Sequence, residues 1–396
     1  LNYQVEMKEA YCMQELSKRT ETFSDSVIRR MTRVSDEYGA INLSQGFPDF
    51  DPPKELTDRL AEVVGEGPHQ YAVTWGAQNF REAVARKQEH FSGMRINPNR
   101  EIVVTCGSTE AMMAAMMSVV NPGEKVIVFS PFYENYGADA ILSGAEPIYV
   151  PLNPPEFTFD ADVLEAAFKQ GVKALILCNP SNPCGKVFTE AELKTIAELA
   201  IRYDAYVITD EVYEHIVYKP NHHTYLAALP GMRERTIICN SLSKTYSITG
   251  WRLGYVIAAP EIIERVKKVH DFLTVGAAAP LMEAAVAGLN LPYRYYEELA
   301  AHYTHMKDLF LGGLKHMGVH YTEPQGAYYV LVDIDPYRHM GESDYDFCVR
   351  MVKEVGVAAV PGSSFFREDV NNLMRLHFAK SDAVLLEALN RLERLK

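Results

Sequence analysis

The sequence of 396 residues lacks the features that mark membrane proteins and disulfide-rich secreted proteins. No apolar run reaches the roughly 18 residues that a membrane span needs, and residues 1–20 are charged throughout, without the apolar core of a signal peptide. The six cysteines have no framework spacing: they are Cys12, Cys106, Cys178, Cys184, Cys239 and Cys348. We therefore expect free thiols in a reducing compartment, and a cytoplasmic protein without membrane contact.

An excess of positive charge is also missing. The chain has 39 Lys and Arg against 52 Asp and Glu, a net charge of −13, which argues against a nucleic-acid partner. The histidine pairs at residues 222–223 and 302–305 lack the further ligands of a metal centre, so we expect no metal site. A local pocket for a small anion is still compatible with this charge.

Seven short β-rich runs are present in the middle of the chain. They are residues 101–107, 125–133, 146–152, 172–180, 205–213, 235–241 and 252–260. Amphipathic helical segments lie between several of them, for example residues 189–204, where Thr189 is the expected N-cap. Because the runs are apolar on both faces, they predict a largely parallel sheet with helices on each side, an α/β domain over residues 44–287.

The pattern changes after residue 287. A long polar helix is expected over residues 293–318, followed by a strand within 326–334, a helix within 344–356 and a further strand within 373–379. These segments predict a smaller α+β domain over residues 288–396, which residues 1–43 join.

Polar residues follow several of the predicted strands, where ligands of doubly wound sheets bind. Ser108 and Thr109 open a helix after the first run, and free backbone N–H groups at such a position bind anions. Asn182 lies in the rigid turn "NPSNPCG", and Asp210 ends a buried strand. Capping or turn formation explains each of these residues equally well when it is taken alone.

The stretch "NSLSKTYSITGWRLGY", residues 240–255, adds a more specific signal. A solvated surface position is the default for any lysine, but Lys244 has Ser241, Ser243 and Arg252 nearby in the sequence. Hydroxyls and a guanidinium suit a phosphate dianion. A lysine near a phosphate site, with a strand-end acid on the same rim, is what pyridoxal 5′-phosphate (PLP) requires.

The motifs "SLSKTYSITGWRLGY", "NPSNPCG" and "DEVY" together resemble the class I and II aminotransferases of PLP fold type I, over nearly the whole chain. "INLSQGFPDFDPP" and "QYAVTWGAQNFREAVA" are most similar to the subgroup of kynurenine, glutamine, methionine and aromatic aminotransferases. The resemblance implies a mainly parallel seven-stranded sheet between helices in a large domain, plus a smaller α+β domain.

The resemblance also implies roles around the cofactor ring. Lys244 corresponds to the lysine that binds PLP covalently and then moves the substrate proton. Asp210 corresponds to the partner of the pyridine nitrogen, while Asn182 and Tyr213 correspond to donors to the phenolic oxygen of the ring. Tyr133 corresponds to the aromatic side chain that stacks on the ring.

Other matching residues are implied to bind the phosphate and the substrate. The phosphate shell comprises Ser108, Thr109, Ser241, Ser243 and Arg252, with Tyr71 reaching in from the neighbouring subunit of a homodimer. Arg375 and Asn182 correspond to residues that hold the substrate carboxylate, together with the backbone of Gly46. An arginine inside an apolar strand is costly without an anion, which independently favours this role for Arg375.

The sequence thus predicts an aminotransferase that acts by a ping-pong mechanism on an amino acid and a 2-oxo acid. No second arginine is evident for a distal carboxylate, which favours neutral, aromatic or sulfur-containing donors. A C–S β-lyase on the same scaffold is the alternative, because the first chemical steps are shared. A non-catalytic PLP-binding protein is a further alternative, which the intact Lys244, Asp210 and Arg375 disfavour.

Overall fold

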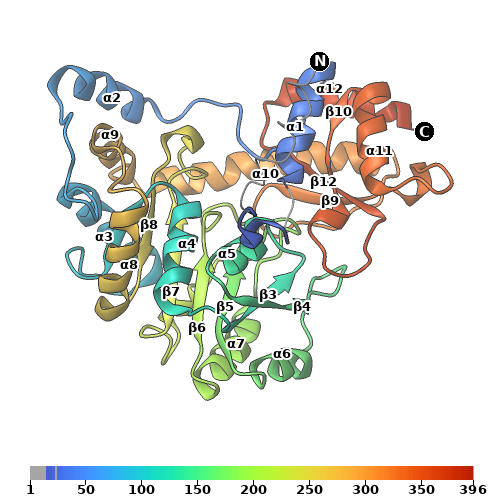
Figure 1. The fold of residues 1–396 in the computed structure, drawn as a ribbon. Helices are drawn as coiled ribbons and strands as arrows, with labels where there is room; N and C mark the ends of the chain where they lie inside the picture. The colour runs from blue at the N-terminus through green and yellow to red at the C-terminus, as the bar shows by residue number, and fades with distance from the viewer. Residues whose placement is uncertain (1–14, 23–24, 396) are drawn as a thin grey trace, which may run out of the picture.

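The computed structural model describes residues 15–22 and 25–395 (Figure 1). It contains one large sheet of seven strands, a three-stranded sheet and a two-stranded sheet. No helix in this part of the chain is long and apolar enough to cross a membrane. Cys12 lies outside the described residues, and the other five cysteines form no disulfide among them.

The large sheet has the strand order β2-β8-β7-β6-β5-β3-β4. Its strands are β2 (Ile102–Thr105), β3 (Lys125–Ser130), β4 (Glu146–Pro151), β5 (Val172–Cys178), β6 (Tyr206–Asp210), β7 (Thr236–Ser241) and β8 (Gly254–Ile257). Each predicted β-rich run contains one of these strands. All neighbours pair in parallel except β8, which is antiparallel to both β2 and β7. The predicted fold class is therefore confirmed.

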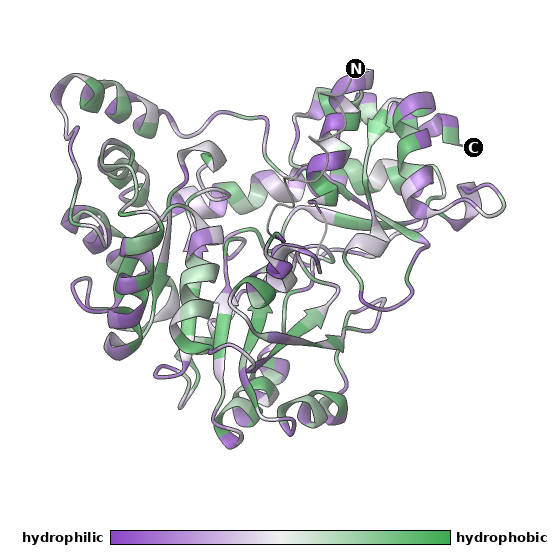
Figure 2. Cartoon of the chain, viewed as in Figure 1, coloured by the Kyte–Doolittle hydropathy of each residue, from purple (hydrophilic) through white to green (hydrophobic). Residues whose placement is uncertain are grey.

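Both faces of this sheet are buried, because alternate side chains of a strand enter different cores. On β3, Val126 and Val128 pack with one set of helices, whereas Ile127 and Phe129 pack with another. The first set is α4 (Ser108–Val119), α5 (Asn135–Leu142) and α8 (Pro260–Leu273); the second is α6 (Ala161–Phe168) and α7 (Glu190–Arg202). Figure 2 shows the result, with mostly green strands between helices that are green on one side and purple on the other.

Three further helices cover the edge of the sheet formed by β2 and β8. They are α2 (Lys54–Glu66), α3 (Gln78–Ser92) and α9 (Ala279–Leu289). Leu56 of α2, Phe80 of α3 and Met282 of α9 pack in one hydrophobic core with Ile102 of β2 and Tyr255 of β8.

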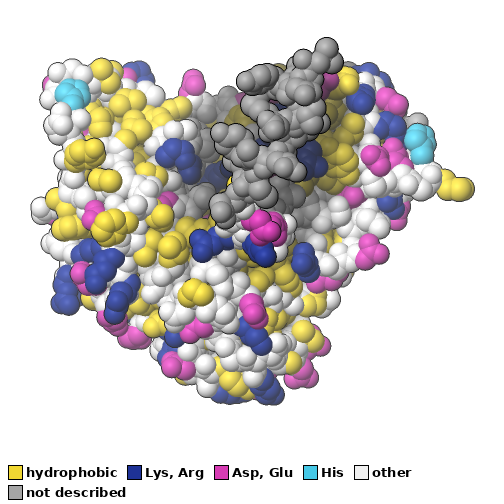
Figure 3. All heavy atoms as spheres, viewed as in Figure 1, with side chains coloured by type: hydrophobic (Ala, Val, Ile, Leu, Met, Phe, Trp, Pro, Cys, Tyr) yellow, Lys and Arg dark blue, Asp and Glu magenta, His cyan; other side chains and the backbone are white. Residues whose placement is uncertain are grey.

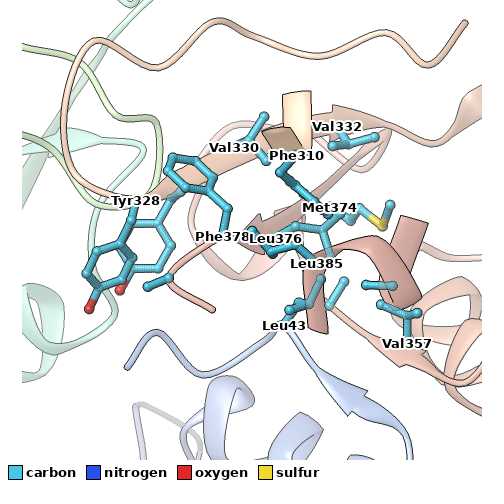
Figure 4. Close-up of a cluster of buried hydrophobic side chains, with 14 of the residues drawn as sticks. Leu43, Phe310, Tyr328, Val330, Val332, Val357, Met374, Leu376, Phe378 and Leu385 are labelled. Carbon is cyan, nitrogen blue, oxygen red and sulfur yellow. The ribbon is translucent and has the colours of Figure 1, made fainter. Parts of the chain in front are cut away.

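The C-terminal part forms a second layer of structure beside the sheet (Figure 1). Its elements are α10 (Arg294–His316), β9 (Tyr329–Asp333), α11 (Asp344–Arg350), β10 (Val357–Ala358), β11 (Val360–Pro361), β12 (Leu373–His377) and α12 (Asp382–Leu392). The order β11-β12-β9 is antiparallel throughout. Figure 4 shows the core of this unit, in which Phe310, Val330, Leu376 and Leu385 pack together.

The N-terminal segment is attached to this C-terminal unit. It contains α1 (Val27–Tyr38) and β1 (Ile41–Asn42), and β1 pairs in parallel with β10, with Ile41 opposite Val357. The domain boundaries at residues 43/44 and 287/288 stay predictions. This attachment brings the loop that follows β1 close to β9 and β12.

Helix α7 offers a test of the local signals that define the fold. Thr189 forms the predicted cap: its hydroxyl accepts from the backbone N–H of Glu192 at 3.2 Å, and the Glu192 carboxylate accepts from Thr189 N at 2.8 Å. Replacing Thr189 by Ala should lower the free energy of unfolding by about 1 kcal/mol. Thr195→Ala is the matched control, because that exposed hydroxyl only bonds back to the carbonyl of Ala191. If thermal denaturation showed the same loss of stability in Thr189→Ala and Thr195→Ala, the stabilising role of the Thr189 cap would be contradicted.

Candidate active site

A cavity of about 380 Å³ opens beside the carboxyl ends of β5, β6 and β7. Twelve predicted site residues line it: Gly46, Ser108, Thr109, Tyr133, Asn182, Asp210, Tyr213, Ser241, Ser243, Lys244, Arg252 and Arg375. Tyr71 does not line it; its side chain is 85% exposed on the surface of the chain. On the face drawn in Figure 3, side chains of both charge signs lie at the surface. The cavity itself is lined by the cations Arg29, Lys244, Arg252 and Arg375 and by the acids Glu134 and Asp210.

One end of the cavity is built to hold an anion. The first backbone N–H groups of α4, at Ser108 and Thr109, donate to no acceptor among the described residues, and no side chain caps this helix. Gly107 has φ +83°, and a Cβ there would lie 2.3 Å from Nη2 of Arg252. Glycine is therefore required for the guanidinium to lie against the helix start. With the hydroxyls of Ser241 and Ser243, this arrangement suits a phosphate.

Lys244 lies at the centre of the cavity. Its Nζ donates to the carbonyl oxygen of Gly46 at 3.1 Å and lies 5.8 Å from the ring centroid of Tyr328. Burial lowers the pKa of Lys244 to about 8; the charge of Asp210 opposes this shift, while Arg252 and Arg375 add to it. At neutral pH roughly one amine in ten is then uncharged and able to attack a carbonyl.

Asp210, at the end of β6, is buried in the floor of the cavity. Its carboxylate accepts from the hydroxyl of Tyr136 at 2.7 Å and from the backbone N–H of Val212 at 3.3 Å. Burial raises the pKa of Asp210 to about 6, while these two donors and Lys244 oppose the shift. The carboxylate is thus charged at neutral pH and can stabilise a protonated ring nitrogen.

Arg375 extends from β12 into the cavity and is 1% exposed. Its Nη1 donates to Oδ1 of Asn182 at 2.8 Å and its Nη2 to the carbonyl of Ser44 at 2.7 Å. Its Nε has no partner, and no carboxylate pairs with it among the described residues. Since a guanidinium only donates, the oxygen of Asn182 must face Arg375, which leaves the amide NH₂ of Asn182 free to donate elsewhere.

Several cavity residues were missed by the sequence analysis. Tyr136 and Tyr329 are the most consequential; others in the lining are Ser26, Ile28, Arg29, Gln45, Phe47, Glu134, Val212, Thr249 and Gly250. Tyr136 follows Tyr133 by three residues across the start of α5, and the two rings meet edge to face at 5.7 Å. The spacing of three residues from Tyr133 could have identified Tyr136 as a cavity residue. The sequence carries no comparable signal for Tyr329, because it lies in an apolar strand.

The arrangement fits PLP. The helix start with Arg252 suits the phosphate, Asp210 suits the ring nitrogen, and a lysine with a lowered pKa suits the aldehyde. The Nε of the buried Arg375 has no partner among the described residues, which suits an anion at the other end of the cavity.

Comparison with known proteins gives the same result over nearly the whole chain. The family described as "Aminotransferase class I and II" matches residues 38–392. Methionine aminotransferase from Escherichia coli is 36% identical over 93% of this chain and 96% of its own length. Kynurenine–oxoglutarate transaminase from Dictyostelium discoideum is 32% identical over 96% of each chain. The structure of N-succinyldiaminopimelate aminotransferase from Mycobacterium tuberculosis superposes with a TM-score of 0.93 at 34% identity, covering 96% of this chain and all of that one.

The lowered pKa of Lys244 can be measured without substrate. In the cofactor-free protein, acylation of Lys244 should have its half-maximal rate near pH 8, because only the neutral amine reacts and the ordinary value for lysine is above 10. Peptide mass spectrometry at a series of pH values gives the profile. Asp210→Asn should move the midpoint to lower pH, since the carboxylate favours the charged amine. A midpoint near the ordinary value in both proteins would contradict the electrostatic description.

Proposed function

The chain belongs to the class I and II aminotransferases, which are PLP-dependent enzymes, and on that premise we propose that it moves the amino group of a neutral, aromatic or sulfur-containing L-amino acid to a 2-oxo acid. The observation that carries the proposal is the buried guanidinium of Arg375, which shares a cavity with Lys244 and has no carboxylate partner among the described residues. An amino acid or a 2-oxo acid supplies that carboxylate.

Each end of the substrate has a matching group. Arg375 binds the carboxylate with the N–H groups it has left, assisted by the backbone N–H of Gly46, which donates to nothing else described. We assign to Lys244 the removal of the proton from the substrate Cα and its return. When bound, PLP supplies the electron sink that makes this proton acidic, and the carboxylate of Asp210 keeps its ring nitrogen protonated.

The remaining site residues orient the cofactor. Asn182 and Tyr213 would donate to the phenolic oxygen of the cofactor, and Tyr133 would stack on its ring. The start of α4 and the side chains of Ser241, Ser243 and Arg252 bind the phosphate. Together these residues would hold the cofactor in one orientation toward Lys244 and the substrate.

The proposed substrate class rests on apolar and aromatic residues in the lining of the cavity. Ile28, Phe47 and Tyr329 offer apolar and aromatic surface to a side chain. Two of the named relatives are a methionine and a kynurenine aminotransferase, which agrees with such a surface, whereas the third is an N-succinyldiaminopimelate aminotransferase. Contrary to the sequence analysis, the structure does bring a further arginine to the cavity, the exposed Arg29. Aspartate and glutamate therefore belong among the donors to be compared.

We further propose a homodimer, with Tyr71 of one chain completing the phosphate shell of the other. The support is that Tyr71 is 85% exposed and does not line the cavity of its own chain, while Phe272 is also highly exposed. Five cysteines are free within the part of the chain that the structure describes, which agrees with the reducing environment that we propose.

Substitution of the central lysine tests the chemistry. Lys244→Ala should abolish multiple turnover and the visible absorbance of the covalently bound cofactor, because no other amine lines the cavity within the described residues. Lys268→Ala removes an exposed lysine and is the matched control. Full activity of the Lys244 variant, measured as 2-oxo acid formed, would refute the assignment.

Substitution of the buried arginine tests substrate binding. Arg375→Ala should raise KM for amino donors by the equivalent of about 2 to 5 kcal/mol, the cost of losing a desolvated charge pair. Bound PLP, followed by absorbance, should remain. Arg367→Ala removes an exposed arginine outside the cavity and should leave KM unchanged. An unchanged KM in the Arg375 variant would show that another group holds the carboxylate.

A panel of donors distinguishes the proposal from its alternatives. Methionine, phenylalanine, kynurenine, aspartate and cystathionine are each offered with and without a 2-oxo acid. Amino transfer that depends on the 2-oxo acid supports the proposal, and the ratio of kcat/KM values ranks the donors. Release of pyruvate and ammonia from cystathionine without a 2-oxo acid would identify a β-lyase instead.

A further inference from the structure

Tyr329 connects two of the groups that the proposed function depends on. It lies on β9 and is 3% exposed, and its hydroxyl oxygen is 2.9 Å from that of Tyr213, in the segment that follows β6. On its other side, Cζ of Arg375 lies 4.3 Å from the centroid of the Tyr329 ring. A single side chain of the C-terminal unit therefore contacts the donor to the cofactor and the arginine for the substrate.

The hydrogen bond between the two phenols has only one possible direction once Tyr213 donates to the cofactor. Burial raises the pKa of both Tyr213 and Tyr329, so each carries its proton at neutral pH. Each hydroxyl has one hydrogen to donate. If Tyr213 gives its hydrogen to the phenolic oxygen, Tyr329 must be the donor to Tyr213. Successive hydrogen bonds of this kind polarise one another, which makes Tyr213 a stronger donor.

Close packing fixes Tyr329 in this position. A Cβ on Gly46 would lie 2.1 Å from the Tyr329 hydroxyl oxygen, so only glycine leaves room for it. The carbonyl of the same Gly46 accepts from Lys244 Nζ at 3.1 Å and from Tyr328 Oη at 2.9 Å. The Tyr329 hydroxyl is thus confined between the Gly46 backbone and Tyr213.

We propose that Tyr329 is a positioning residue with two separable actions: its hydroxyl strengthens Tyr213 as a donor to the phenolic oxygen of PLP, and its ring holds Arg375 for the substrate carboxylate. The inference rests on the proposed function, because it assigns Tyr213 and Arg375 their roles there. The two actions belong to different atoms of one side chain, so different substitutions separate them.

Other groups that face the two phenols are accounted for. They are Arg375 from β12, which opposes the rise in the pKa of Tyr329, Cys178 at the end of β5, and Tyr328, which directly precedes β9. Tyr133 and Tyr303 also lie close enough to Tyr329 for their charges to interact with it. Of these side chains only Tyr303 is changed below, in the control variant, and the others are common to all proteins compared.

The hydroxyl is tested by Tyr329→Phe in the PLP-loaded protein. Without the Tyr329 hydroxyl, Tyr213 becomes a weaker donor, and the anionic form of the phenolic oxygen is less stable. The nitrogen of Lys244 that is bonded to the cofactor therefore keeps its proton to higher pH. The pH midpoint of the visible absorbance should move to higher pH by about 0.3 to 1 unit, the equivalent of one neutral hydrogen bond. KM for the amino donor should change little, because the ring stays. Tyr213→Phe should shift the midpoint further, and adding Tyr329→Phe to it should have no additional effect.

The ring is tested by Tyr329→Leu, which should also raise KM for the amino donor several-fold, since Arg375 loses the face on which it lies. Tyr303→Phe is the matched control: its hydroxyl is buried in the same region without a partner among the described residues, so neither midpoint nor KM should move. Melting temperatures verify that each variant is folded.

The outcomes separate this inference from the proposed function. If the unsubstituted protein shows neither the absorbance nor amino transfer, the proposed function fails. If it shows both, but Tyr329→Phe leaves the midpoint unchanged or shifts it equally in the Tyr213→Phe background, the role of the hydroxyl is overturned. An unchanged KM in Tyr329→Leu overturns the role of the ring.

Discussion

The burial of a positive charge without a negative partner is the constraint on which the site depends. Arg375 is 1% exposed, and among the described residues it bonds only to an amide and a backbone carbonyl. A buried cation of this kind is costly unless an anion compensates it. The fold holds it between two aromatic faces, Tyr329 and Phe365, which compensate part of the charge without removing the need for an anion. The substrate carboxylate that we propose for this site would offset the remaining cost.

The same positive field sets the protonation of the reacting lysine. Arg375 and Arg252 both lower the pKa of Lys244, and Asp210 raises it, so the result of about 8 is a balance between partners from three parts of the chain. Between pH 6 and 8 the acid is charged while part of the amine is neutral. On the proposed function, anions bound at both ends of the cavity would change that balance and so link substrate binding to the protonation of Lys244.

Much of this was predictable from sequence, for reasons that are local. Each strand of the large sheet was visible as an apolar run, and the residues that end the runs, such as Asp210 and Asn182, meet because parallel strands end at one edge. Tyr329 was not predictable, because its neighbour Tyr213 lies 116 residues away and its strand reads as ordinary core. The antiparallel direction of β8 depends on chain reversal after residue 241, which composition does not encode. Tyr71 cannot be placed in one chain, since its predicted partner is a second copy.

Identification of the residue that carries the cofactor tests the account most directly. The loaded protein is reduced with borohydride, which makes the linkage permanent, and its peptides are mapped by mass spectrometry. The account predicts one pyridoxyl group per chain, on Lys244. A group on any other lysine, or no stable group after reduction of a protein that retains PLP, would contradict it.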